Sequence, residues 1–152
     1  MLEDKINQDL KSALLGGDKV LATTLRGLKS SLLYAKIANN SRDKAMSDEE
    51  VIAVFQKEAK KRQESADLYL QGGNHERAEA ELVEKAVISK YLPSQLADEE
   101  VAKLVDAAIA TLTSSGQPTM GAVIGIVKAQ AAGRADGAVI ARIAKDRLES
   151  RA

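Results

Sequence analysis

The sequence predicts an all-α protein, in which an N-terminal domain of about four helices (residues 1–93) precedes a C-terminal three-helix bundle (residues 97–152). Only 3% of the residues are aromatic, whereas Ala, Leu, Lys and Glu, which favour helix, are abundant. Apolar residues recur at spacings of three and four, and no segment alternates as a half-buried strand does. Capping residues and Gly or Pro breaks separate the helical segments.

The first two predicted helices meet at a pair of glycines. Leu2, Ile6, Leu10 and Leu14 repeat every four residues and predict a short helix that ends at Gly16 and Gly17. Asp18 is the predicted N-cap of the next helix. The inner face of that helix carries Leu21, Leu25, Leu28, Leu32 and Ala35, and each buried leucine contributes about 1.5–3 kcal/mol.

The third predicted helix starts at a capping box, in which Ser47 is the N-cap and Glu50 stands three residues later. It runs to Gly72 and Gly73 along an apolar stripe of Val51, Ile52, Phe55, Ala59, Ala66 and Tyr69. Arg62 falls inside this stripe. We therefore expect the guanidinium to pair with Glu58 or with an acidic residue of the following helix.

The fourth predicted helix has Asn74 as its N-cap and ends before Pro93, because proline disfavours helical geometry at the preceding residue. Its apolar residues lie on more than one side, with Leu82 and Ala86 on one flank and Val87, Ile88 and Tyr91 on others. We therefore expect it to contact two bodies. The segment from Pro93 to Ala97 is the predicted joint between the domains.

Three shorter helices are predicted after the joint. The first carries Val101, Leu104, Val105, Ala108 and Leu112 and ends at the turn SSGQP. Thr119 caps the second, which carries Met120, Val123, Ile124 and Val127 and stops near Gly133. Asp136 caps the last, whose inward residues are Val139, Ile140, Ile143 and Leu148. These helices span about 55 residues, near the lower size limit for an independent core.

The charge balance excludes a global attraction to polyanions. Lys plus Arg and Asp plus Glu number 22 each, so we expect neither DNA nor a membrane as a partner. The absence of cysteine excludes a disulfide framework, a thiolate zinc site and a thiol nucleophile. The acidic, amphipathic N-terminus is unlike a signal peptide, and no apolar segment approaches the roughly 20 residues that span a bilayer. We therefore expect a cytoplasmic protein.

The segment AAGRADGAVIARIAKDRL raises the main functional question. A P-loop would need more glycines, a Lys-Ser/Thr pair and a preceding strand. A corner between two helices explains Gly133 as the turn, Asp136 as the next N-cap and Gly137 as a point of tight backbone approach. Arg134 is not explained by the corner.

A local excess of basic residues surrounds this corner. From Gly121 onward there are six basic residues and only three acidic ones, Asp136, Asp146 and Glu149. This local excess of positive charge suits phosphate contacts. The candidate nucleic-acid-binding residues are Lys128, Arg134, Arg142 and Lys145. A solvated face is the alternative, because Arg142 and Asp146 are four residues apart and can pair, while Arg147 can extend along the apolar stripe.

No catalytic or metal-binding constellation is visible. His75 is the single histidine and stands at a helix start, so we expect no metal and no cofactor. The acidic runs at residues 48–50 and 98–100 are accounted for by their place at helix N-termini. No serine has the surroundings of a nucleophile elbow.

Three segments together give the chain a family resemblance. Lys61-Arg62-Gln63-Glu64-Ser65, Tyr91-Leu92-Pro93 with Gln95-Leu96, and Gly133-Arg134-Ala135-Asp136-Gly137 occur in the order found in the YqeY proteins. These proteins resemble the tail of the GatB polypeptide of aspartyl/glutamyl-tRNA amidotransferase (the GatB/YqeY domain). Two positions depart from the usual pattern: Ala132, where relatives often have a basic residue, and Ala97, where a serine is usual.

The resemblance implies an N-terminal helical domain, a C-terminal three-helix domain and a link to tRNA-dependent amidation. The implied partners are tRNA and components of the amidotransferase or of aminoacyl-tRNA synthetases. The family label of carbon-nitrogen ligase with glutamine as amide donor leaves catalytic activity open. Three hypotheses follow: a non-catalytic tRNA-binding or accessory module, an enzyme of glutamine-dependent amide transfer, and a protein-protein adaptor that uses the fourth helix.

Overall fold

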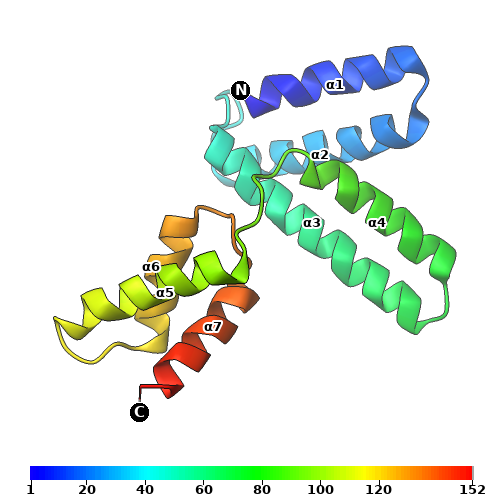
Figure 1. The fold of residues 1–152 in the computed structure, drawn as a ribbon. Coiled ribbons are helices and arrows are strands. Elements are labelled where there is room, and N and C mark those ends of the chain that lie inside the picture. Colours follow the sequence, from blue (N-terminus) through cyan, green and yellow to red (C-terminus); the bar gives the residue numbers. More distant parts are fainter. Residues whose placement is uncertain (152) are drawn as a thin grey trace. The chain divides into compact units, whose positions relative to one another are not determined.

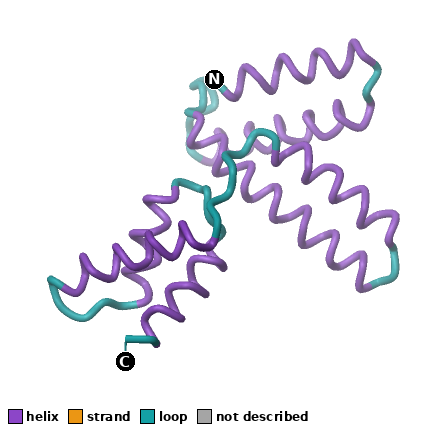
Figure 2. The backbone as a smooth tube through the Cα atoms, viewed as in Figure 1, coloured by secondary structure: helices purple, strands orange, loops and turns teal. Residues whose placement is uncertain are grey.

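The computed structural model describes residues 1–151, and all regular structure in that range is helical (Figures 1 and 2). The prediction of an all-α fold is confirmed. The seven helices are α1 (Leu2–Gly16), α2 (Lys19–Ala38), α3 (Asp48–Gln71), α4 (His75–Ser89), α5 (Asp98–Thr113), α6 (Met120–Ala131) and α7 (Gly137–Glu149).

The chain divides into two compact units. The first covers Met1–Leu92 and holds α1 to α4, while the second begins at Pro93 and holds α5 to α7. In the first unit α1 runs antiparallel to α2, and α3 runs antiparallel to α4 (Figure 1). In the second unit each helix packs against the other two. Helix α4 ends at Ser89, four residues before Pro93.

Side-chain caps determine where most helices begin. Ser47 and Glu50 form the predicted capping box, with Ser47 Oγ accepting from the Glu50 amide at 3.2 Å and Glu50 Oε2 accepting from the Ser47 amide at 2.9 Å. The predicted caps of α2, α4, α6 and α7 also accept amide hydrogen bonds, and they are Asp18, Asn74, Thr119 and Asp136. The cap position of α5 is Ala97, which offers no side-chain acceptor. Of the helices α2 to α7, α5 is therefore the one whose first amides lack a side-chain cap.

The core of the first unit joins all four of its helices. Its fully buried side chains include Ile6, Leu25, Leu28, Phe55 and Ile88. The last residue of the predicted four-residue repeat, Leu14, is 49% exposed, whereas Ala13 is buried. A spacing of four residues advances 40° beyond a full helical turn, so a run of 2, 6, 10 and 14 rotates away from the core. Leu82 of α4 is also exposed rather than packed.

A charged cluster lies between α3 and α4. Arg62 donates from Nη1 to Glu58 Oε2, and from Nε to Glu84 Oε2 at 3.3 Å. Lys61 contacts the other oxygen of Glu58 at 3.2 Å. Burial tends to raise the pKa of Glu58, but the hydrogen bonds from Arg62 and Lys61 outweigh it and hold the pKa below its usual value. Arg62 thus pairs both with Glu58 and with an acidic residue of the following helix, the two partners expected from the sequence.

Candidate functional site

The turn between α6 and α7 begins at Ala132, one residue before Gly133. Helix α6 ends at Ala131, and Ala132 takes the left-handed cap conformation with φ 48°, followed by Gly133 with φ 83°. Gly133 takes part in the turn as predicted, and Ala132, which the sequence did not single out for this role, shares the left-handed conformation. The Leu96 amide donates to the Arg134 carbonyl at 2.7 Å, which ties the turn to the segment before α5.

Gly137 accommodates a side chain rather than a second backbone. A Cβ atom at this position would lie 3.3 Å from Lys128 Cε and 3.5 Å from Lys128 Nζ. The predicted close backbone approach at Gly137 is thus replaced by the side chain of Lys128. As a result, the exposed Lys128 ammonium lies beside the N-terminus of α7, which carries the positive end of the helix dipole.

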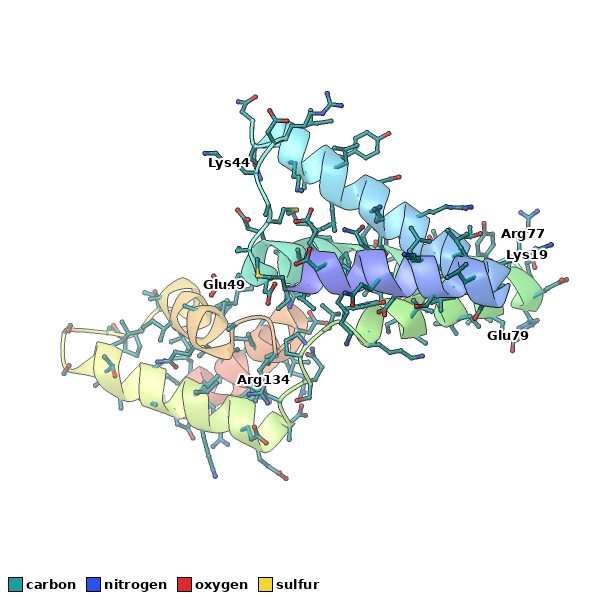
Figure 3. All side chains as sticks on the ribbon, turned by 90° about the horizontal axis from the view of Figure 1, so that it is seen from above. Lys19, Lys44, Glu49, Arg77, Glu79 and Arg134 are labelled. Atoms are coloured by element: carbon teal, nitrogen blue, oxygen red, sulfur yellow. The ribbon has the colours of Figure 1, made fainter. Side chains whose placement is uncertain are left out.

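Arg134 has no carboxylate partner among the described residues. It is exposed on the second unit (Figure 3) and donates from Nε to the Ser94 carbonyl at 3.0 Å, with Nη2 3.5 Å from Ser94 Oγ. Both acceptors are uncharged. The segment of the second unit that precedes α5 therefore orients the guanidinium without neutralising it, and the remaining N–H groups of Arg134 have no partner in the described chain.

Arg142 pairs with a different acid from the one that spacing suggests. Its Nη2 donates to Asp98 Oδ2 at 2.9 Å, so the alternative pairing with Asp146 on the same helix is wrong. Both side chains are more than half exposed, and such pairs contribute little. Lys145 is exposed and has no partner in the described chain, while Arg147 lies 3.7 Å from Asp106.

The basic excess is local to α6 and α7. In residues 93–152, Lys103, Lys128, Arg134, Arg142, Lys145, Arg147 and Arg151 are matched in number by Asp98, Glu99, Glu100, Asp106, Asp136, Asp146 and Glu149. The acids of α5 supply the balance. Of the four candidate cations, Lys128, Arg134 and Lys145 remain without a carboxylate partner among the residues described.

Two hollows lie in the first unit, away from these residues. One, the α1–α2 groove, has a volume of 340 Å³. It is lined by residues of α1, of α2 and of the loop after α2: Glu3, Ile6, Asn7, Lys29, Ser30, Leu32, Leu33, Lys36 and Arg42. Glu3 pairs with Lys36 and also accepts from the Met46 amide at 3.0 Å. Burial opposes the charge on Glu3, but these hydrogen bonds prevail and keep its pKa below the usual value.

The second hollow, of 360 Å³, lies where α1 and α2 meet the end of α4. Tyr91 lines it and donates from its hydroxyl to Asp9 Oδ2 at 2.5 Å. Burial, the hydrogen bond to Asp9 and its negative charge all raise the pKa of Tyr91. The sequence pattern did not single out this pair, since residues 82 positions apart show no periodic relation.

The described residues contain no group of three or more His, Asp or Glu side chains that could hold a metal ion. His75 is exposed at the first position of α4, where the sequence placed it. Among residues 1–151, no helix is both long enough and apolar enough to cross a bilayer.

Comparison with known proteins agrees with the family resemblance. The protein called altered inheritance of mitochondria protein 41, mitochondrial, from Eremothecium gossypii is 30% identical over 112 residues, which cover 72% of this chain. The match spans 60% of that protein's own length. The model of the family described as Yqey-like protein matches residues 3–148. The chain therefore belongs to the YqeY family.

Proposed function

We propose that this protein is a non-catalytic RNA-binding module that contacts tRNA through the turn between α6 and α7. We choose tRNA among the possible RNAs because the sequence resemblance implies a relationship to the glutamine-dependent tRNA amidotransferase. On this proposal the module acts in the cytoplasm as an accessory to the amidotransferase or to aminoacyl-tRNA synthetases.

The observation that carries the proposal is the pair of cations on the two sides of one turn. Lys128 brings its ammonium beside Gly137, and Arg134 holds its guanidinium on the uncharged acceptors of Ser94. Neither charge is neutralised by a carboxylate in the described chain. Together with the positive end of α7, they favour a phosphate group at the surface, where contacts with the nucleic-acid backbone supply affinity.

Arg142 and Lys145 extend the surface along α7. They stand three residues apart and so lie on one side of the helix. Because the Arg142–Asp98 pair is exposed, a phosphate can replace Asp98 as the partner of Arg142 at little cost. The four side chains then offer phosphate contacts without a pocket for a base, which favours recognition of backbone shape over sequence.

Filter binding of bulk tRNA across a salt series tests the proposal. The variant Arg134→Glu/Arg142→Glu should bind more weakly than the wild type, with a salt slope reduced by about one unit for each lost phosphate contact. Lys57→Glu/Lys60→Glu makes the same change in charge on exposed, unpartnered side chains of α3 and serves as the matched control. Equal binding and equal slopes for the wild type and the α7-side variant would end the proposal.

A further inference from the structure

The largest local charge imbalance of the first unit lies on α2 and the loop that follows it. Between residues 19 and 46, Lys19, Arg26, Lys29, Lys36, Arg42 and Lys44 face a single acid, Asp43, in a chain with no net charge. Lys19 lies at the beginning of α2 and Lys44 beyond its end (Figure 3). A basic field therefore covers the length of this helix.

The cations at the α1–α2 groove are free to meet a partner. Lys36 is paired with Glu3, but Lys29 and Arg42 have no carboxylate or hydrogen-bond acceptor in the described chain. The side chains of Asn7 and Ser30 also have no hydrogen-bond partner there. The groove thus holds three positive charges and one negative charge, and two exposed cations and two exposed neutral polar groups in it have no protein partner among the described residues.

The same groove has an apolar floor that continues along the outer face of α2. Ile6 and Leu32 close the floor, and Leu33 lines it while remaining 44% exposed. Ile37 follows Leu33 by one helical turn and is 48% exposed, and Leu14 shares a face of α1 with Asn7, seven residues earlier. Aliphatic side chains spaced in this way match the apolar stripe of another helix.

We propose that the α1–α2 groove docks an acidic amphipathic helix of a partner protein. Its apolar stripe would lie on Leu33 and Ile37, and its carboxylates would face Lys29 and Arg42. The aliphatic floor favours a protein segment over RNA, since phosphate contacts need no exposed leucine or isoleucine. This inference does not depend on the RNA-binding proposal, because it uses a surface of the first unit, whereas the proposed RNA contacts lie on the second.

A designed peptide provides the probe. A fluorescently labelled helix of 18 residues, about 27 Å long, carries Leu at positions i, i+3, i+4 and i+7 and Glu on both flanks. A scrambled peptide of the same composition keeps the charge but loses the apolar stripe. Fluorescence anisotropy with the full chain should show saturable binding of the first peptide, weakened by salt, and affinity for the scrambled peptide at least tenfold lower.

Two pairs of variants locate the binding. Lys29→Gln/Arg42→Gln should weaken peptide binding at least tenfold, whereas Lys57→Gln/Lys60→Gln, which removes the same charge from α3, should leave it unchanged. Leu33→Asp should abolish binding, whereas Leu68→Asp, at an exposed leucine of α3, should retain it. Far-ultraviolet circular dichroism of each variant confirms that the helices are intact.

Three results would overturn the inference. The first is equal affinity for the amphipathic and scrambled peptides, which would show that charge alone acts. The second is unchanged binding by the Lys29/Arg42 variant. The third is direct binding of a single-stranded RNA oligonucleotide or of anionic phospholipid vesicles that is tighter than binding of the peptide and is lost in the same variant.

Discussion

Removal of Arg62 should destabilise the first unit by about 2–3 kcal/mol. Loss of one partner from a buried ion pair typically costs about 3–5 kcal/mol. Here the side chain of Glu58 is 10% exposed but would keep Lys61, while Glu84 is partly exposed and would be hydrated. These two features place the expected cost of Arg62→Met below the usual range. The paired variant Glu58→Gln/Arg62→Met removes the stranded charge and should recover at least about 1 kcal/mol.

Urea unfolding followed by circular dichroism at 222 nm measures these differences. Because the pKa of Glu58 in the folded protein lies below its ordinary value of 4.5, its charged form stabilises the fold fully above that value. This contribution is lost as the pH falls through the folded-state pKa. The cost of Arg62→Met should therefore shrink between pH 7 and pH 3. A cost below about 0.5 kcal/mol at pH 7, or one independent of pH, would refute the structural role assigned to the cluster.

Four further substitutions test three features: the helix caps, the turn before α7 and the Tyr91 hydroxyl. Ala97→Ser should supply the missing cap of α5 and raise stability by about 1 kcal/mol, while Ser47→Ala should lower it by a similar amount, both read from thermal unfolding. Ala132→Gly should relieve the left-handed conformation and stabilise the second unit by about 1 kcal/mol, and a loss of stability would contradict this. The pKa of Tyr91 is raised in the folded protein, so the stabilisation by its neutral hydroxyl is complete below the ordinary tyrosine pKa and is lost only as the pH rises through the higher folded-state value. Absorbance at 295 nm should therefore show one tyrosine that ionises above the usual range. Tyr91→Phe should remove that last step of the titration.

Helix positions could be predicted from the sequence because their signals are local. The hydroxyl of Ser47 and the carboxylate of Asp136 lie within three residues of the amides that they accept from. A cap therefore depends on neighbours in the chain and not on tertiary structure. The buried face of α2 was also predictable, since Leu25, Leu28 and Leu32 follow the helical period closely.

Side-chain contacts between different helices were harder to predict from the sequence. Arg142 binds Asp98, 44 residues earlier, because packing of α7 on α5 brings the two surfaces together. Spacing along the chain offered only Asp146. The cap conformation of Ala132 also escaped prediction, because glycine is the residue that normally adopts it, and Gly133 stood next in the sequence. In both cases the sequence pointed to a residue close in the chain, Asp146 or Gly133, whereas the folded structure also uses a residue that local spacing did not indicate, Asp98 or Ala132.

The α1–α2 groove was missed for a related reason. The basic run from Lys19 to Lys44 is visible in the sequence, but its significance depends on which cations the fold neutralises. The structure pairs Lys36 with Glu3 and leaves Lys29 and Arg42 unpaired. A charge count by segment, rather than over the whole chain, would have identified this helix as a candidate interaction surface.

The two units differ in their exposed apolar side chains, and this difference favours a different kind of partner for each. Among the described residues, the large exposed hydrophobic side chains all lie between Met1 and Val83, and the second unit has none. A surface with cations but no exposed aliphatic groups suits a hydrated polyanion, whereas cations beside exposed leucine and isoleucine suit an amphipathic protein segment. If this division is correct, Leu33→Asp should abolish peptide binding and leave the affinity for tRNA unchanged, while Arg134→Glu/Arg142→Glu should do the reverse. Loss of both activities in either variant would mean that one surface serves both ligands, and the assignment of separate partners to the two units would then be wrong.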